Sequence, residues 1–369
     1  MHVVLTAAYG MGNVGDEAIA EMAIRHLRDV VPEARITVLV WDMNQWRRAH
    51  GCAEVRALPG LFQHVLTRPT MWLGMVRAVA AIGGCDALVM GGGGLVRDRP
   101  GWLREYLRSV RLAAFFRKRI VVLSVGADRI TNRRLRPALR VFQDVHALSV
   151  RDASSRENLV EAIDGVPHVD IVSDGVFDWP TVSRVPPAAP VLGINLCDIQ
   201  SAEGMGAEEP RWLDILSDVL KGLDEGRSLR IVSLPTTVKD VVLSRRFCSL
   251  GAGREHIEAA TPGDYTRQLS RCTAFIGMRL HACILASRVQ GLPMRCIAYA
   301  PKTMDAFRDC GAGESVFTSE DLATDAFRAS VLSALTGDSA HEPAFHCGAG
   351  KTHPRDWLRT HLGLSLIHI

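Results

Sequence analysis

Short apolar segments alternate with longer amphipathic segments along most of the chain, and this order constrains the fold more than any other feature. In the first half we expect strands at residues 2–8, 36–41, 86–90, 120–125 and 147–150, and helices at 16–31, 102–117, 134–145 and 154–163. Short buried strands separated by helices are typical of a mostly parallel sheet that is covered by helices on both faces.

The composition changes at Pro180, Pro186, Pro187 and Pro190, which lie in a segment of otherwise small and polar residues. Successive prolines favour an extended chain and forbid a helix, so a domain boundary is predicted here. A second series follows, with expected strands at 191–196, 229–234, 273–276 and 294–299, and expected helices at 211–223, 238–250, 264–272, 280–289 and 302–309. We therefore predict an α/β fold of two Rossmann-like doubly wound domains facing a cleft. They are expected at 1–180 (acceptor side) and 190–345, with a C-terminal tail at 346–369.

Composition excludes several classes of protein. The net charge of +3 over 369 residues gives no reason to expect nucleic-acid binding. The nine cysteines are dispersed without a Cys-x-x-Cys pair, which argues against a zinc site and for reduced thiols. No signal peptide or membrane-spanning segment is recognised, so a cytoplasmic protein is expected. We expect neither a metal nor a cofactor.

The segment Ile276 to Ala282 joins a predicted strand to a predicted helix and places Arg279 and His281 at the carboxyl end of the strand. Open α/β sheets hold their ligands at that edge. The arginine side chain is a rigid fork for a phosphate or carboxylate, and histidine exchanges a proton near neutral pH. This pair suits a small anionic substrate that must be both bound and protonated.

The turn Gly10-Met11-Gly12-Asn13-Val14-Gly15-Asp16-Glu17 follows the first strand and matches the glycine spacing of a dinucleotide site, with Asp42 after the next strand. Asp16 and Glu17 would add negative charge where a helix N-terminus should attract a pyrophosphate. They also suit a helix N-terminus for structural reasons alone. The charge argument favours a turn in which Asn13, Asp16 or Glu17 binds sugar hydroxyls.

Four glycines, Gly91 to Gly94, follow another predicted strand. They let the backbone approach a ligand or another element closely, and we take Gly92 and Gly93 as candidate binding positions. A flexible strand-to-helix turn is the alternative interpretation.

Two further strand ends carry charged residues. Arg151 and the following helix N-terminus form either an anion seat or a plain helix cap in which Arg151 pairs with Asp152. Asp174 could orient a hydroxyl or a cationic side chain, and a turn residue before Gly175 is the other interpretation. Lys302, after Tyr299, can reach the same sheet edge as His281, or it begins a helix in solvent.

These stretches, in this order, resemble the polysaccharide pyruvyl transferase family from about residue 5 to about residue 310. The resemblance is carried by Gly12 to Glu17, Gly91 to Gly94, Ser149 to Asp152, Asp174, Gly277 to His281, and Tyr299 with Lys302. One departure is Asp174-Gly175-Val176, where aspartate, proline and a small residue are expected.

The resemblance implies a glycosyltransferase-B-like arrangement and transfer of the enolpyruvyl unit of phosphoenolpyruvate to two hydroxyls of a sugar, with release of phosphate. It implies phosphoenolpyruvate contacts at Arg151, His281 and Lys302, and an acceptor that is a sugar or a lipid-linked glycan for a cell-surface polymer. Peripheral contact with the inner membrane face is part of this expectation. Arg279 is a further candidate for holding the donor's charge, and His281 is the best general acid.

Other classes remain open at this point. A nucleotide-sugar glycosyltransferase would need an acidic ribose-binding residue in the second domain, for which Asp240 and Glu258 are weak candidates. A nicotinamide oxidoreductase would rest on the Gly10 to Gly15 pattern alone. A non-catalytic protein that binds a sugar or phosphate is the third alternative.

Overall fold

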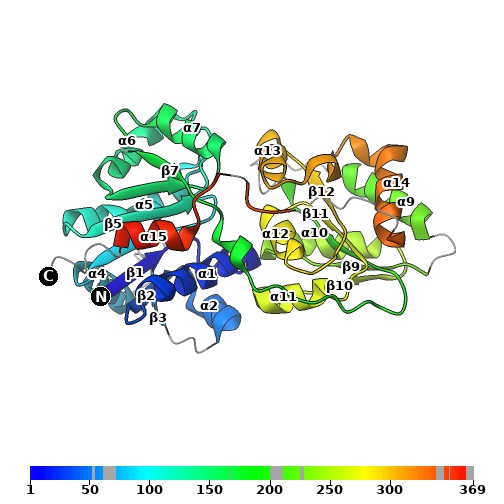
Figure 1. The fold of residues 1–369 in the computed structure, drawn as a ribbon, viewed down its shortest axis with the longest axis horizontal. Helices are drawn as coiled ribbons and strands as arrows, with labels where there is room; N and C mark the ends of the chain where they lie inside the picture. Colours follow the sequence, from blue (N-terminus) through cyan, green and yellow to red (C-terminus); the bar gives the residue numbers. More distant parts are fainter. Residues whose placement is uncertain are drawn as a thin grey trace. The chain divides into compact units, whose positions relative to one another are not determined.

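A computed structural model describes residues 1–51, 55–60, 72–166, 168–199, 211–224, 228–337, 345–348 and 350–362, with only the backbone described at 100, 102, 211, 301 and 302. The chain divides into two compact units (Figure 1). Unit 1 comprises Met1–Met11, Asp16–Asp178 and Ala349–Ile369, and unit 2 comprises Gly12–Gly15 and Trp179–Gly348.

Unit 1 is built on a seven-stranded parallel sheet in the order β3-β2-β1-β4-β5-β6-β7. The strands are β1 (His2–Thr6), β2 (Arg35–Val40), β3 (Arg56–Pro59), β4 (Ala87–Gly91), β5 (Arg119–Val125), β6 (Ala147–Val150) and β7 (Val169–Ile171). The helices of this part are α1 (Val14–Val30), α2 (Met43–His50), α4 (Trp72–Gly83), α5 (Pro100–Phe115), α6 (Arg136–Leu139), α7 (Ala153–Ala162) and α15 (Pro354–Leu362). Strands β1 and β4 are buried along their whole length, as strands covered on both faces should be.

Unit 2 has a six-stranded parallel sheet in the order β10-β9-β8-β11-β12-β13. Its strands are β8 (Val191–Asn195), β9 (Arg230–Ser233), β10 (Arg254–His256), β11 (Ala274–Gly277), β12 (Met294–Ala298) and β13 (Val316–Thr318). Its helices are α9 (Arg211–Asp224), α10 (Val238–Ser249), α11 (Pro262–Leu269), α12 (Leu280–Ser287), α13 (Pro301–Asp309) and α14 (Asp325–Thr336). One core joins β8, β11, α9 and α14.

The expected doubly wound sheets are therefore present, and one expected helix is not. Residues 134–145 form two 3-10 segments, Arg133–Leu135 and Arg140–Asp144, on either side of the four-residue α6. Pro137 lies in the first turn of α6, where its missing N–H is tolerated, but it prevents one continuous helix from running through this stretch.

The proline-rich segment is extended but is bonded to unit 2 along its length. The Val182 N–H donates to Arg288 O at 2.8 Å, the Gln290 N–H donates to Val182 O at 2.9 Å, and the Val185 N–H donates to Ser270 O at 2.8 Å. These bonds place the segment with unit 2, and the division between the units falls after Asp178.

The C-terminal segment returns to unit 1. Thr352 forms a parallel bridge with Val172, α15 contacts β5, and the Trp357 indole donates to Asp170 at 2.8 Å. Figure 1 shows α15 beside the sheet of unit 1. Residues 363–369, the end of the expected tail, lie outside the described residues. Among the described helices, none combines the length and hydropathy that a membrane span requires.

Candidate functional site

Each sheet reverses its strand order at one point, and several of the predicted site residues follow the strands that flank it. In unit 2 the reversal lies between β8 and β11, and β11 leads into Arg279 and His281. In unit 1 it lies between β1 and β4, and these strands lead into the two glycine-rich turns. Ligands of open α/β sheets bind at such points.

Arg279 is the N-cap of α12, and its guanidinium is bonded to protein. Its Nε and Nη2 donate to the two carboxylate oxygens of Asp240 at 2.6 Å and 2.7 Å. Asp240 is fully buried in the first turn of α10, and its Oδ1 also accepts from the Asp198 N–H at 2.9 Å. The Nε and Nη2 side of the guanidinium is therefore bound to Asp240 and fixes the chain just after β11.

Asn195, which is fully buried at the end of β8, fixes the same part of the chain. Its amide donates to Leu234 O at 2.9 Å and its oxygen accepts from the Arg279 N–H at 3.1 Å. Sequence reasoning missed Asn195, and it considered Asp240 only as a ribose ligand. The available signals were a polar residue ending an apolar strand and an aspartate in the first turn of a helix.

The residues Gly12–Gly15 belong to unit 2 although their neighbours along the chain belong to unit 1. The Val14 N–H donates to Thr236 O at 2.8 Å, and Asn13 forms an antiparallel bridge with Thr237. The Asn13 side chain accepts from the Gly15 N–H at 3.0 Å, which shapes the turn.

Gly15 lies directly against His281. A Cβ added at Gly15 would come within 2.7 Å of His281 Cβ and 3.0 Å of its Nδ1. Only glycine leaves room for the imidazole in its present position. The structure therefore brings together two motifs that lie about 260 residues apart in the sequence.

Two other predicted positions lie after the neighbouring strand β12. Tyr299 packs against the core of unit 2, and burial raises the pKa of its hydroxyl to about 12, so it is neutral near pH 7. Lys302 is in the first turn of α13, and its side chain lies outside what the structure describes.

In unit 1 the glycine run packs against another element. Gly92 has a φ of +62°, and a Cβ there would lie 2.2 Å from Ile19 Cγ2 of α1. Gly93 has a φ of +79°, and Asp16 Oδ1 is 3.5 Å from the position of its missing Cβ. The close approach expected of these glycines is thus made to α1.

Glu17 is buried, and both of its carboxylate oxygens are bonded within the protein. Oε1 accepts from the Gly10 N–H at 2.8 Å, and Oε2 lies 2.9 Å from His50 Nε2. Asp42 caps α2 by accepting from the N–H groups of Asn44 and Gln45. The Gly10 N–H and the Asp42 carboxylate, which a dinucleotide site would use, are therefore hydrogen-bonded within the protein.

Asp16, Glu17 and Asp174 all act electrostatically on a buried tyrosine. Burial, and then these three carboxylates, raise the pKa of Tyr9 well above its ordinary value, and its hydroxyl donates to Gly91 O at 2.9 Å. Asp174 is itself buried and accepts from the Val176 N–H at 3.1 Å, as a turn residue does. Asp174 therefore acts on the same tyrosine as Asp16 and Glu17, which are adjacent to each other and far from Asp174 in the sequence.

Arg151 shows the capped arrangement that the sequence left open. Asp152 is the N-cap of α7 and accepts from the Ser155 N–H at 2.7 Å, and Arg151 Nε donates to its other oxygen at 3.1 Å. The guanidinium also packs on Gly126, where a Cβ would lie 3.0 Å from Arg151 Cζ. The carboxylate of Asp152 therefore occupies the helix N-terminus.

Solved structures with the same fold cover the whole chain at low identity. They include the Staphylococcus aureus MnaA–UDP co-structure (TM-score 0.62, 8% identity, covering 100% of this chain and 97% of that one). UDP-GlcNAc 2-epimerase from Neisseria meningitidis bound to UDP-GlcNAc has a TM-score of 0.59 at 9% identity. Anabaena Alr3699/HepE in complex with UDP and glucose has a TM-score of 0.58 at 11% identity. Each of these two matches covers 100% of both chains. This likeness confirms the predicted glycosyltransferase-B-like fold.

A search of curated proteins found no significant match. The family model described as polysaccharide pyruvyl transferase matches residues 13–301, a span that includes Asn13, Arg151, Asp174 and the Arg279-Leu280-His281 motif. The predicted family and the predicted transferase activity are thereby confirmed. The chain belongs to the polysaccharide pyruvyl transferase family.

Proposed function

We propose that this transferase moves the enolpyruvyl group of phosphoenolpyruvate onto two hydroxyls of a sugar in a cell-surface polysaccharide or its precursor, forming a cyclic ketal and releasing phosphate. The observation that carries the proposal is the contact between Gly15 and His281 at the strand reversal of unit 2. It joins two sequence motifs that are specific to the family as a pair, although neither is specific alone.

His281 is proposed as the general acid. It protonates the methylene carbon of the donor, which makes the central carbon an electrophile. One sugar hydroxyl adds to that carbon, and a second hydroxyl displaces phosphate, so two C–O bonds form and the C–O bond between the central carbon and the phosphate group breaks. No redox change occurs: one of the two hydroxyl protons restores the acid form of His281, and the other leaves with phosphate.

Arg279 and Glu17 are proposed as positioning residues. Arg279 is held by Asp240 and fixes the start of α12, one residue before the helix that carries His281. Glu17 fixes the turn at Gly10. Lys302 and Arg151 are proposed to neutralise the charge of phosphoenolpyruvate, as the family resemblance implies. Asn13, Asp16 and Asp174 are proposed to orient hydroxyls, with Gly92 and Gly93 shaping the turn beside them.

Kinetics separate these roles. Arg151→Ala and Lys302→Ala should raise the KM for phosphoenolpyruvate more than the KM for the acceptor. Equal effects on both substrates would argue against a donor contact.

A nucleotide-sugar glycosyltransferase is the second candidate, because structural neighbours of this fold were solved with UDP or UDP-GlcNAc. Its predicted ribose ligands are already bonded: Asp240 to Arg279, and Glu258 to Arg245 at 2.8 Å with His256 at 3.0 Å. This favours the pyruvyl transfer.

The deciding experiment incubates the chain with phosphoenolpyruvate and a panel of free and lipid-linked sugars, and follows inorganic phosphate and the ketal product. Parallel reactions contain UDP-sugars and are assayed for UDP. Phosphate release that depends on an acceptor supports the proposal, and UDP release with no reaction of phosphoenolpyruvate overturns it. Vesicles of inner-membrane composition added to the same reactions test peripheral attachment at the cytoplasmic face.

A further inference from the structure

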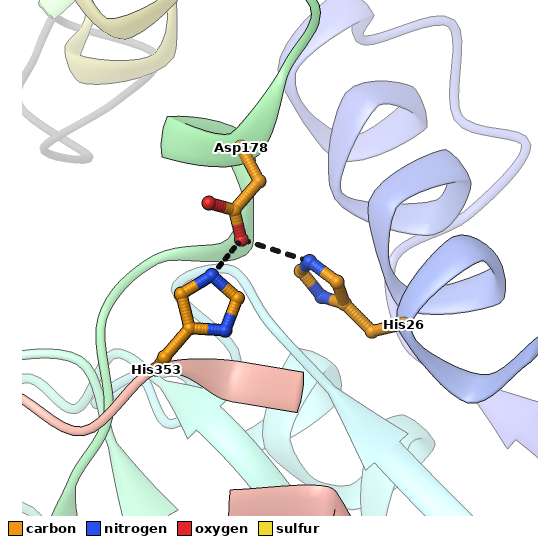
Figure 2. Close-up of side chains that lie close together, drawn as sticks. All are labelled: His26, Asp178 and His353. Carbon is orange, nitrogen blue, oxygen red and sulfur yellow. Dashed lines mark ion pairs between the residues drawn. The ribbon is translucent and has the colours of Figure 1, made fainter. Parts of the chain in front are cut away.

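Two histidines and an aspartate from three distant parts of unit 1 converge on one point (Figure 2). His26 lies in α1, Asp178 ends the 3-10 segment Gly175–Asp178, and His353 immediately precedes α15. Nε2 of each histidine is 2.8 Å from the same carboxylate oxygen, Asp178 Oδ2. Within the described part of the chain, this is the one group of three such residues whose ligand atoms all lie within 4.8 Å of one another.

The contacts in this cluster are close, and they leave one buried polar atom without a partner. His26 Nδ1 makes no hydrogen bond, whereas Asp178 Oδ2 has the two imidazole Nε2 atoms as its close contacts. The His26 side chain is only 4% exposed, so water cannot readily serve it. Because two imidazole nitrogens face one carboxylate oxygen, a cation placed among them would be bound by all three groups.

The backbone beside the cluster makes room for the His26 ring. A Cβ on Gly175 would lie 3.3 Å from His26 Cε1 and 3.6 Å from its Nδ1. Gly175 is the position at which this chain departs from the proline that the family resemblance leads us to expect. The chain therefore has glycine in place of the expected proline at the residue that packs against His26.

We propose that His26, Asp178 and His353 bind a divalent transition-metal ion of the zinc type. Imidazole nitrogen and carboxylate oxygen are ligands that Zn²⁺ accepts, and three protein ligands leave a fourth position for water. Ligand atoms about 2.1 Å from a tetrahedral ion lie roughly 3.4 Å apart. The observed 2.8 Å separations therefore need to widen by roughly 0.6 Å, which small side-chain rotations supply.

The ion would fasten the C-terminal segment to unit 1. Thr352, next to His353, already accepts from the Ser173 N–H at 3.0 Å and donates its own N–H to Ile171 O at 3.2 Å. His353 is 37% exposed, which gives an ion a route to the cluster. The site serves stability and is independent of the proposed reaction.

The test is a Zn²⁺ titration of the full chain after removal of metals with a chelator, read with a competing indicator and by thermal melting. We expect one equivalent to bind and Tm to rise, because a ligand that binds only the folded state stabilises it. Removing a residue that only supports a metal ligand costs about 10–100-fold in affinity. His353 is a proposed direct ligand, so His353→Gln should lower the affinity for Zn²⁺ by at least about 10–100-fold. Asp178→Asn replaces the charged ligand by a neutral amide and should also lower the affinity for Zn²⁺ by at least about 10–100-fold.

His168→Gln is the matched control. His168 lies 3.0 Å from Asp170 in the same unit and is 86% exposed, but among the residues that the structure describes the pair belongs to no three-residue group within 4.8 Å. This variant should bind Zn²⁺ as the wild type does. Co²⁺ in place of Zn²⁺ should give visible absorption without a thiolate charge-transfer band, which separates this site from the cysteines.

The proposal is overturned if the wild type binds no stoichiometric Zn²⁺, if both His353→Gln and Asp178→Asn bind as the wild type does, or if the Co²⁺ spectrum is that of a thiolate. In the first case the cluster is only an ion pair that shares protons. Retention of activity by a variant that has lost Zn²⁺ leaves the proposed function intact, so the two claims fail separately.

Discussion

Asp240 holds the guanidinium of Arg279 by two short hydrogen bonds of 2.6 Å and 2.7 Å, and Arg279 follows β11, one of the two strands between which the strand order of unit 2 reverses. The carboxylate is fully buried and the arginine side chain is 22% exposed. Such a pair fixes the backbone that leads to His281.

Replacing Asp240 with asparagine should destabilise unit 2, because the guanidinium loses its charged partner in a buried setting. We expect the free energy of unfolding in urea to fall by about 3–5 kcal/mol. Asp218→Asn is the control, since the Lys221–Asp218 pair is exposed (54% and 74%), and it should change stability by less than about 1 kcal/mol. Similar small losses in both variants would show that the buried pair does not brace the fold.

Gly15→Ala should impair catalysis more than stability. The new methyl group would lie 2.7 Å from His281 Cβ, so the imidazole must move, and a displacement of about 1 Å can cost about 10²-fold in rate. Gly222→Ala in α9 has nothing within 4 Å and should keep full turnover. Steady-state kcat with urea unfolding checks both variants; an unchanged kcat for Gly15→Ala would contradict the packing argument.

Gly92→Ala should be markedly destabilising. The φ of +62° strains any side chain, and the added Cβ would lie 2.2 Å from Ile19 Cγ2, so overpacking adds about 1–3 kcal/mol to the strain. Gly337→Ala shares the positive φ (+77°) with open space around it, and should lose only about 1 kcal/mol. Equal losses in urea unfolding would mean that contact with α1 contributes nothing.

The cap of α7 should give a pH-dependent stability. Burial alone would raise the pKa of Asp152, but Arg151 and hydrogen bonds from Ser155 and Ser154 together lower it below its ordinary value. A lowered folded-state pKa gives stability that is present above the unfolded pKa of about 3.9 and is lost as the pH falls through the folded value. The stability difference between wild type and Asp152→Asn should therefore be largest near pH 7 and shrink below about pH 4.

Asn can still cap a helix, so Asp152→Ala separates the cap from the charge. It should lose about 1 kcal/mol more than Asp152→Asn at pH 7. A difference between wild type and Asp152→Asn that is the same at pH 7 and pH 3 would refute the charge contribution.

Most of the fold was predictable, because parallel strands buried on both faces are continuous apolar runs. Strand 147–150 was predicted with the bounds that the structure has. The edge strands β3 (Arg56–Pro59), β10 (Arg254–His256) and β13 (Val316–Thr318) were missed, because they are three or four residues long and are not fully buried. The prediction of one helix at 134–145 was wrong because Pro137 interrupts the helix despite the apolar spacing around it.

The candidate site was predictable residue by residue but not as an arrangement. Strand ends identified Arg279, His281 and Arg151, yet their partners Asp240 and Gly126 come from distant parts of the sequence, and no spacing rule links them. The His26–Asp178–His353 cluster was missed for the same reason, since its members lie 152 and 175 residues apart.

The most direct test of the proposed reaction is the turnover of His281→Gln, measured as phosphate release from phosphoenolpyruvate with an acceptor that the wild type pyruvylates. The account predicts a fall in kcat of about 10²–10⁴-fold with unchanged circular dichroism and melting, because general acid catalysis is lost while the fold is kept. Turnover at the wild-type rate would contradict it.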